Sequence, residues 1–94
     1  MFIESPEDTT YTLDARVIAA RTITDFYAKT DSGTCFVQLK NATDVTTISG
    51  ITASSTGLTG SISNASVDQN DRLRIEVSSS STPVDLEIVV GYEQ

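Results

Sequence analysis

The sequence predicts an all-β fold, namely an antiparallel two-sheet sandwich or jelly roll of about seven to eight short strands. Apolar residues recur at every second position in several short runs, which is the period of a half-buried strand. Turn-forming residues separate these runs at intervals of roughly ten residues. The chain is also rich in serine and threonine, which suit strands and turns better than long helices.

The length and net charge of the chain limit the number of domains and the classes of partner that we expect. The 94 residues suffice for one domain with one core. Thirteen aspartate and glutamate residues outnumber six scattered lysines and arginines, and the formal charge is -7. We therefore expect no nucleic-acid partner and no membrane partner. No apolar run is long enough to span a bilayer, and the acidic start differs from a secretory leader, so we expect a complete chain made and kept in a cytosol.

Residues 1–10 are interpreted as an N-terminal arm that precedes a single β-sandwich domain over residues 11–94. The arm carries two apolar residues after the initiator, Phe2 and Ile3. Two interpretations remain open, because the arm either docks these side chains on a neighbouring molecule or is a frayed terminus. The docking interpretation makes Phe2 and Ile3 candidate partner-binding residues.

Residues 22–41 are predicted to form the central hairpin of the fold. Before them, alternation over residues 11–17 predicts the first strand, and residues 18–21 form a corner. Within 22–41, two β-patterned runs are joined by Asp31-Ser32-Gly33, a tight-turn sequence in which Gly33 can adopt a positive φ. The other polar segments are then expected to add strands to this hairpin.

The loop length of this hairpin decides which side chains face outward. If the loop has two residues beginning at Asp31, Tyr27 lies opposite Phe36 on the outer face, and we favour this alignment. A two-residue loop beginning at Ser32 leaves Tyr27 diagonal to Phe36, whereas a three-residue loop sets Phe36 beside Ala28. In the favoured alignment Tyr27 and Phe36 are candidate partner-binding residues, and the alternative is that loops of the same chain cover them.

The same alignment assigns the core side of the hairpin. Ile23 belongs to this side only if a β-bulge falls near Thr24 and Asp25. Cys35, the single cysteine, is then expected to act as a small buried hydrophobe. The expected core residues of the hairpin are Phe26, Ala28, Cys35, Val37 and Leu39.

The second half of the chain is predicted to end in another hairpin. Residues 41–60 are the least apolar part and are expected to form short edge strands and loops, with a flexible linker as the alternative. Residues 68–71 form a turn. The strands 73–77 and 86–92 are then joined by the loop 78–83. In this hairpin the outward Arg72 and Arg74 could meet Asp85 or Glu87 across the strand pair.

Few residues suggest chemistry. The chain has no histidine, which removes the commonest general base, and one cysteine, which rules out an intrachain disulfide. Asp68, Asn70 and Asp71 crowd oxygen atoms that calcium prefers, but such sequences are also common in turns, and we favour the turn. We expect no enzymatic activity, no cofactor and no metal.

Several segments resemble small β-sandwich structural modules of tailed bacteriophage virions, a group that includes head decoration or cement proteins and fibre-type proteins. The likeness covers residues 11–93. It rests on Tyr11-Thr12-Leu13-Asp14, Ile23-Thr24-Asp25-Phe26, Ser32-Gly33-Thr34-Cys35-Phe36-Val37-Gln38-Leu39, residues 67–77 and Asp85-Leu86-Glu87-Ile88.

The resemblance implies a non-enzymatic virion protein. A free-standing chain of this length is similar to a capsid decoration or cement protein, which binds the outer face of an assembled phage head. The implied partners are the major capsid protein and further copies of the chain in a trimer, and the implied location is the virion after synthesis in the host cytoplasm. The alternative is a tail fibre or spike module in which Tyr27, Phe36 or Tyr92 stacks on a host-surface carbohydrate.

Overall fold

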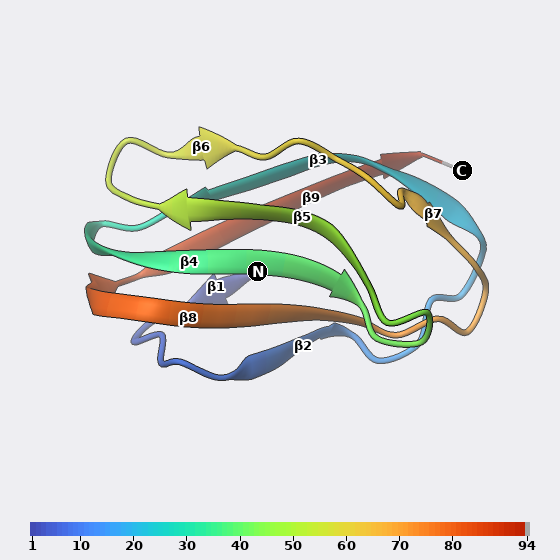
Figure 1. The fold of residues 1–94 in the computed structure, drawn as a ribbon, viewed down its shortest axis with the longest axis horizontal. Coiled ribbons are helices and arrows are strands. Elements are labelled where there is room, and N and C mark those ends of the chain that lie inside the picture. Colours follow the sequence, from blue (N-terminus) through green and yellow to red (C-terminus); the bar gives the residue numbers. More distant parts are fainter. Residues whose placement is uncertain (94) are drawn as a thin grey trace.

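The computed structural model describes residues 1–93, and these residues form nine strands and no helix. The strands lie in two antiparallel sheets packed face to face (Figure 1). The predicted all-β sandwich is therefore confirmed. The strands are β1 (Phe2–Ile3), β2 (Thr10–Asp14), β3 (Arg21–Lys29), β4 (Ser32–Asn41), β5 (Thr46–Ala53), β6 (Leu58–Thr59), β7 (Ser66–Val67), β8 (Leu73–Val84) and β9 (Leu86–Glu93).

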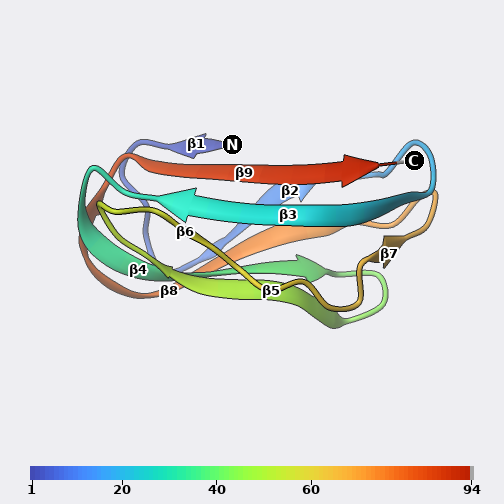
Figure 2. The ribbon, with the colours of Figure 1, turned by 90° about the horizontal axis from the view of Figure 1, so that it is seen from above.

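The order of the strands is that of a jelly roll. Sheet A has the order β1-β9-β3-β6, with β7 also paired to β3, and sheet B has the order β2-β8-β4-β5. Figure 2 shows the two sheets as separate layers, with β9 and β3 in one layer and β4, β5 and β8 in the other. The chain crosses repeatedly between the layers, and among residues 1–93 only β4 and β5 are both consecutive and paired. This interleaved order distinguishes the fold from a stack of hairpins.

The predicted central hairpin over residues 22–41 is wrong. Its two arms are β3 and β4, which belong to different sheets. Gly33 has the expected positive φ of 71°, but the turn around it carries the chain from sheet A to sheet B. A turn sequence specifies a change of direction, and burial decides where the second arm lies. Here the apolar sides of β3 and β4 face each other across the core instead of lying side by side.

The predicted terminal hairpin is wrong for the same reason. β8 continues through the segment 78–83, which was expected to be a loop, and the chain then crosses from sheet B to β9 in sheet A. The two crossings are neighbours, since Ser32 is in register with Val84 and the Asp31 amide donates to the Val84 carbonyl at 2.9 Å. Arg74 consequently lies 3.3 Å from Glu76 of its own strand, not opposite Asp85 or Glu87.

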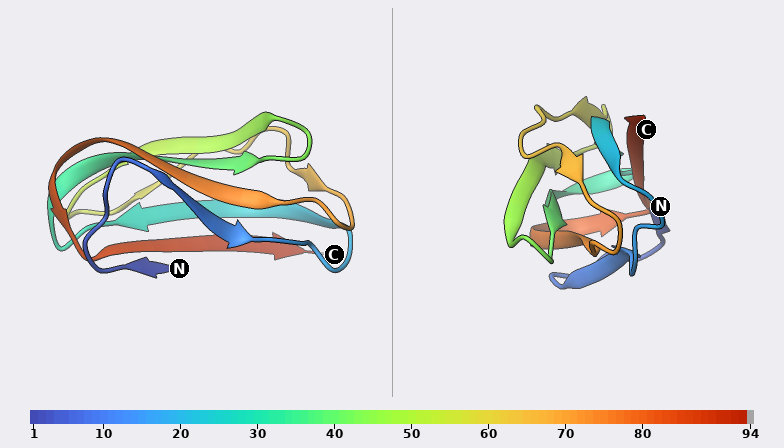
Figure 3. Two further views of the ribbon diagram at one scale, coloured as in Figure 1. Left: turned by 90° about the horizontal axis from the view of Figure 1, so that it is seen from below. Right: turned by 90° about the vertical axis from the view of Figure 1, so that its right-hand side faces the viewer.

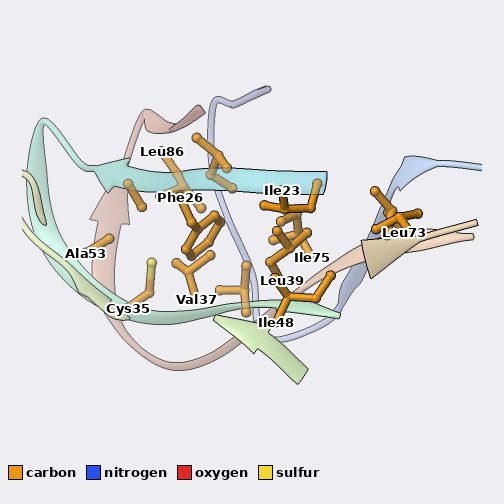
Figure 4. Close-up of a cluster of buried hydrophobic side chains, with 14 of the residues drawn as sticks. Ile23, Phe26, Cys35, Val37, Leu39, Ile48, Ala53, Leu73, Ile75 and Leu86 are labelled. Atoms are coloured by element: carbon orange, nitrogen blue, oxygen red, sulfur yellow. The ribbon is translucent and has the colours of Figure 1, made fainter. Parts of the chain in front are cut away.

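The assignment of faces was correct although the pairing was not. The register between β3 and β9 shifts between Ile23 and Asp25, which confirms the bulge that places Ile23 on the core side. Figure 4 shows side chains of sheet A directed toward those of sheet B. The expected core residues are all buried, including Cys35; the most buried large side chains are Phe26, Leu39, Ile48, Ile75, Leu86 and Ile88.

The local hairpin of the chain is β4–β5, and its turn and second strand lie in residues 41–60, for which short edge strands and loops are predicted. β5 is indeed an edge strand, but it is eight residues long. The connection is shaped by Asn41, which is 1% exposed. Its Oδ1 accepts hydrogen bonds from the amides of Thr43 and Asp44, and its Nδ2 donates to the carboxylate of Asp71 at 2.9 Å. The buried side-chain amide of Asn41 thus stabilises a turn, residues 42–45, that contains no glycine.

The N-terminal arm is partly built into the sandwich. Phe2 and Ile3 form β1 and pair with β9, while Pro6 is buried. β2 begins at Thr10 and ends at Asp14, so the first predicted strand exists but is shorter than 11–17. Figure 3 shows this N-terminal part of the chain running beside the strands β8 and β9. Because residues 1–93 contain no helix, there is also no helix that could cross a membrane.

Candidate interaction surface

A stripe of apolar side chains crosses the outer face of sheet A. Phe2 of β1 is opposite Glu87, whose side chain is exposed, so Phe2 points outward. Val89 lies two residues farther along β9 on the same face and is opposite Tyr27 of β3. Diagonal neighbours in a sheet are within reach of an aromatic side chain. We call Phe2, Val89 and Tyr27 the sheet A stripe.

Two members of the stripe are more exposed than is usual for apolar residues of a sheet. Phe2 is 59% exposed and Val89 is 56% exposed. Tyr27 is half-buried because the turn at Gly57 passes over its ring. A Cβ atom added at Gly57 would lie only 2.9 Å from the Tyr27 ring carbon Cζ. The turn therefore covers part of the tyrosine ring, while the phenylalanine and valine are left uncovered.

Charged side chains lie on both sides of the stripe along β3 and β9. Lys29 and Glu87 are opposite each other on one side. On the other side the Asp25 carboxylate lies over Gly91, with Oδ2 2.8 Å from the position that a Cβ atom of residue 91 would occupy. An apolar patch with a polar rim is typical of a surface that contacts another molecule.

The four residues expected to bind a partner do not share one surface. Phe2 and Tyr27 lie on the outer face of sheet A, but Ile3 is in register with buried Leu86 and packs against the core. Phe36 lies on the outer face of sheet B, where its ring covers Gly50. The predicted Tyr27–Phe36 pair is therefore wrong, because β3 and β4 are not neighbours. The rings of Tyr27 and Phe36 lie on different sheets, so they cannot stack together on one sugar.

Val89 is not among the residues predicted from the sequence to bind a partner. The alternation of Leu86, Ile88 and Val90 assigned the inward residues of this strand correctly. Val89 is an apolar residue at an outward position within that run, and this break in the alternation was the available signal. Only the strand register shows that this outward valine lies between Tyr27 and Phe2 and so forms part of an apolar patch.

The chemically reactive groups do not form a second site. Burial, followed by the charge of Asp8, raises the pKa of the Cys35 thiol, which disfavours the thiolate. Among residues 1–93 no group of acidic or cysteine side chains is arranged to hold a metal ion. In the 68–71 turn, the Asp71 carboxylate accepts hydrogen bonds from Asn41 and from the Asp68 amide. These groups serve the fold.

Comparison of the chain with protein families, characterised proteins and solved structures finds no match.

Proposed function

We propose that the chain is a non-enzymatic structural protein of a virion that binds, as a decoration or cement protein, the outer face of an assembled phage head. The major capsid protein is the proposed partner. The observation that carries this proposal is the sheet A stripe, which leaves Phe2 and Val89 exposed on the outer face of the sheet. Exposed apolar patches with charged borders suit contact with another protein.

The composition of the surface supports the same proposal. A formal charge of -7 favours solubility at high copy number before assembly. The arm contributes through Phe2, while Ile3 and Pro6 pack against the sandwich. Removing residues 1–8 would therefore disturb the fold as well as the surface, and single outward substitutions test the proposal more cleanly.

The test compares Phe2→Ser and Val89→Thr with Ile18→Ser. Ile18 is 77% exposed and lies outside the strands, so its replacement is a control for the loss of exposed apolar surface. Each variant is mixed with shells assembled from the major capsid protein encoded in the same genome, and bound protein is measured by cosedimentation. The proposal predicts that Phe2→Ser and Val89→Thr weaken binding at least tenfold while Ile18→Ser binds normally. Absence of binding by the unmodified chain would refute it.

We extend the proposal to a trimer, the state implied by the resemblance. Sedimentation velocity of the unmodified chain, alone and with shells, measures this directly. If the stripe serves trimer contacts, Phe2→Ser dissociates the trimer in solution. If it serves the shell, the trimer persists and only cosedimentation is lost. A strictly monomeric protein on the shell would contradict the trimer and leave the shell-binding proposal standing.

A further inference from the structure

One edge of sheet A is paired along only part of its length. β1 runs beside β9 at Leu86 and Glu87, and Met1 continues this pairing to Ile88 through two hydrogen bonds, 2.7 and 2.8 Å long. Beyond Ile88, no strand among the described residues pairs with this edge of β9 (Figure 3). The edge from Val90 to Glu93 is therefore open.

The hydrogen bonds on the opposite side of the sheet show which backbone groups point to this edge. The Phe26 carbonyl accepts from Gly60, and the Ile23 amide donates to Ala65, so both residues direct their polar groups away from β9. In antiparallel pairing, the residues opposite them also turn their polar groups away. Those residues are Val90 and Tyr92. Their amides and carbonyls thus face the open edge.

A groove lies beneath the same edge, between the two sheets, and Asp14 and Arg21 line it together with apolar side chains. Its walls include Leu13 and Leu73 from sheet B and Ile88, Val90 and Tyr92 from β9. Its volume is about 240 Å³, which is below the roughly 300–1,000 Å³ of typical small-molecule sites. Arg21 fixes the end wall, because its guanidinium carbon lies 4.3 Å from the centre of the Tyr92 ring. A groove of this size suits side chains rather than a whole ligand.

The outer side of the edge is acidic. Gly91 has no side chain, and the Asp25 carboxylate occupies the space above it. A strand added to β9 would place the residue opposite Gly91 on this outer face, directly beside Asp25. The residues opposite Val90 and Tyr92 would point inward to the groove. The edge therefore selects an apolar residue, a cationic residue and an apolar residue in succession.

We propose that the open edge of β9 binds an extended segment of another protein by strand addition, with apolar side chains in the groove and a lysine or arginine beside Asp25. Strand addition uses main-chain hydrogen bonds for affinity and alternate side chains for specificity. The charges argue against a second copy of this chain as the occupant. Twofold pairing of two such edges centred on Gly91 would bring the two Asp25 carboxylates together, and each copy carries a charge of -7. This inference concerns the edge of sheet A, which shares Asp25 with the border of the sheet A stripe, and it does not depend on the proposed function.

Amide hydrogen exchange tests the open edge without any ligand. We expect the amides of Val90 and Tyr92 to exchange at least tenfold faster than those of Val89 and Gly91, which face β3. Equal protection of all four amides would mean that the edge is covered and would overturn the proposal.

Peptide binding tests the occupant. The probe is the capped peptide Ser-Thr-Val-Lys-Val-Thr-Ser, compared with the same peptide carrying glutamate in place of lysine, with affinities measured by NMR titration. We expect shifts of the Val90 and Tyr92 amides and about fivefold tighter binding of the lysine peptide, as for an exposed charge pair. Asp25→Lys should reverse this preference. Asp25→Asn, which preserves the size of the side chain, should abolish it.

Three results would overturn the proposal. They are equal affinity for the two peptides in the unmodified protein, shifts confined to other parts of the molecule, and a dimer in sedimentation that forms through β9. The dimer would show itself by protection of the Val90 and Tyr92 amides at high protein concentration, and it would strengthen with Asp25→Asn.

Discussion

Substitution of Gly33 by alanine tests the crossing between the two sheets. Gly33 has a φ of +71°, which costs an alanine about 1–2 kcal/mol. An added Cβ atom would also meet the backbone of the neighbouring crossing, overlapping the Thr82 carbonyl oxygen and lying 2.6 Å from that of Ser81. Because backbone cannot move aside as a side chain can, we expect the overlap to add about 1–3 kcal/mol. The total loss of unfolding free energy is then about 2–5 kcal/mol.

Gly57→Ala is a matched control for this experiment. Gly57 has nearly the same φ, +70°, but its Cβ atom would meet only the side chain of Tyr27, which can rotate away. We expect a loss of about 1–2 kcal/mol, which is the cost of the backbone conformation alone. Urea denaturation followed by circular dichroism and tyrosine fluorescence measures both losses. Equal losses would contradict the packing of the two crossings, because in a simple hairpin Gly33 would have no such neighbour.

Three further predictions concern single groups. Partial desolvation, with a hydrogen bond to Asp31 and the charge of Asp31, raises the pKa of the Asp85 carboxyl. The protonated carboxyl therefore stabilises the fold fully below the ordinary aspartate pKa, and this contribution is lost as the pH rises through the raised pKa. Asp85→Asn should raise Tm relative to the unmodified protein more at pH 7 than at pH 3, and an equal change at both pH values would contradict this. Asn41→Ala should lower the unfolding free energy by about 2–4 kcal/mol, because it removes one of the two donors to the buried Asp71 carboxylate and the acceptor of the Thr43 and Asp44 amides. A loss below about 1 kcal/mol in urea denaturation would show that the site repacks. Val45 has a φ of 56°, a conformation that asparagine tolerates better than a β-branched residue, and its side chain is 83% exposed. Val45→Asn should therefore raise the unfolding free energy by about 1 kcal/mol in the same assay. A decrease would show that the valine side chain contributes contacts.

The sequence was sufficient to assign inward and outward faces, because alternation reports burial whichever strand is the neighbour. Phe26 and Val37 were assigned to the core correctly for this reason, and Ile23 joined them through the expected bulge. The pairing of strands could not be obtained in the same way. Asp31-Ser32-Gly33 is compatible with a hairpin and with a crossing between sheets, and the choice depends on contacts with residues 81–84, far along the chain.

Locating the candidate surfaces requires knowing which strands are neighbours in a sheet, and knowing which side chains face outward is not enough. Tyr27 was correctly placed outward, but its neighbours are Val89 and the turn at Gly57, not Phe36. The open edge of β9 could not be predicted from alternation at all. It follows from the short length of β1 and from the hydrogen bonds on the far side of β3, both of which are properties of the assembled sheet.

The position of β8 and β9 has a consequence for synthesis of the protein. These strands come last in the described chain, yet each lies inside its sheet, between an N-terminal strand and a strand from the middle of the chain. A ribosome that has released only the first 72 residues has therefore produced β2 and β4 without the strand that joins them. Apart from the β4–β5 hairpin, little of the sandwich can form before β8 and β9 emerge, so folding is expected to be slow and to wait for the synthesis of these two strands. Exposed sheet edges in the nascent chain would then be the main hazard during its production.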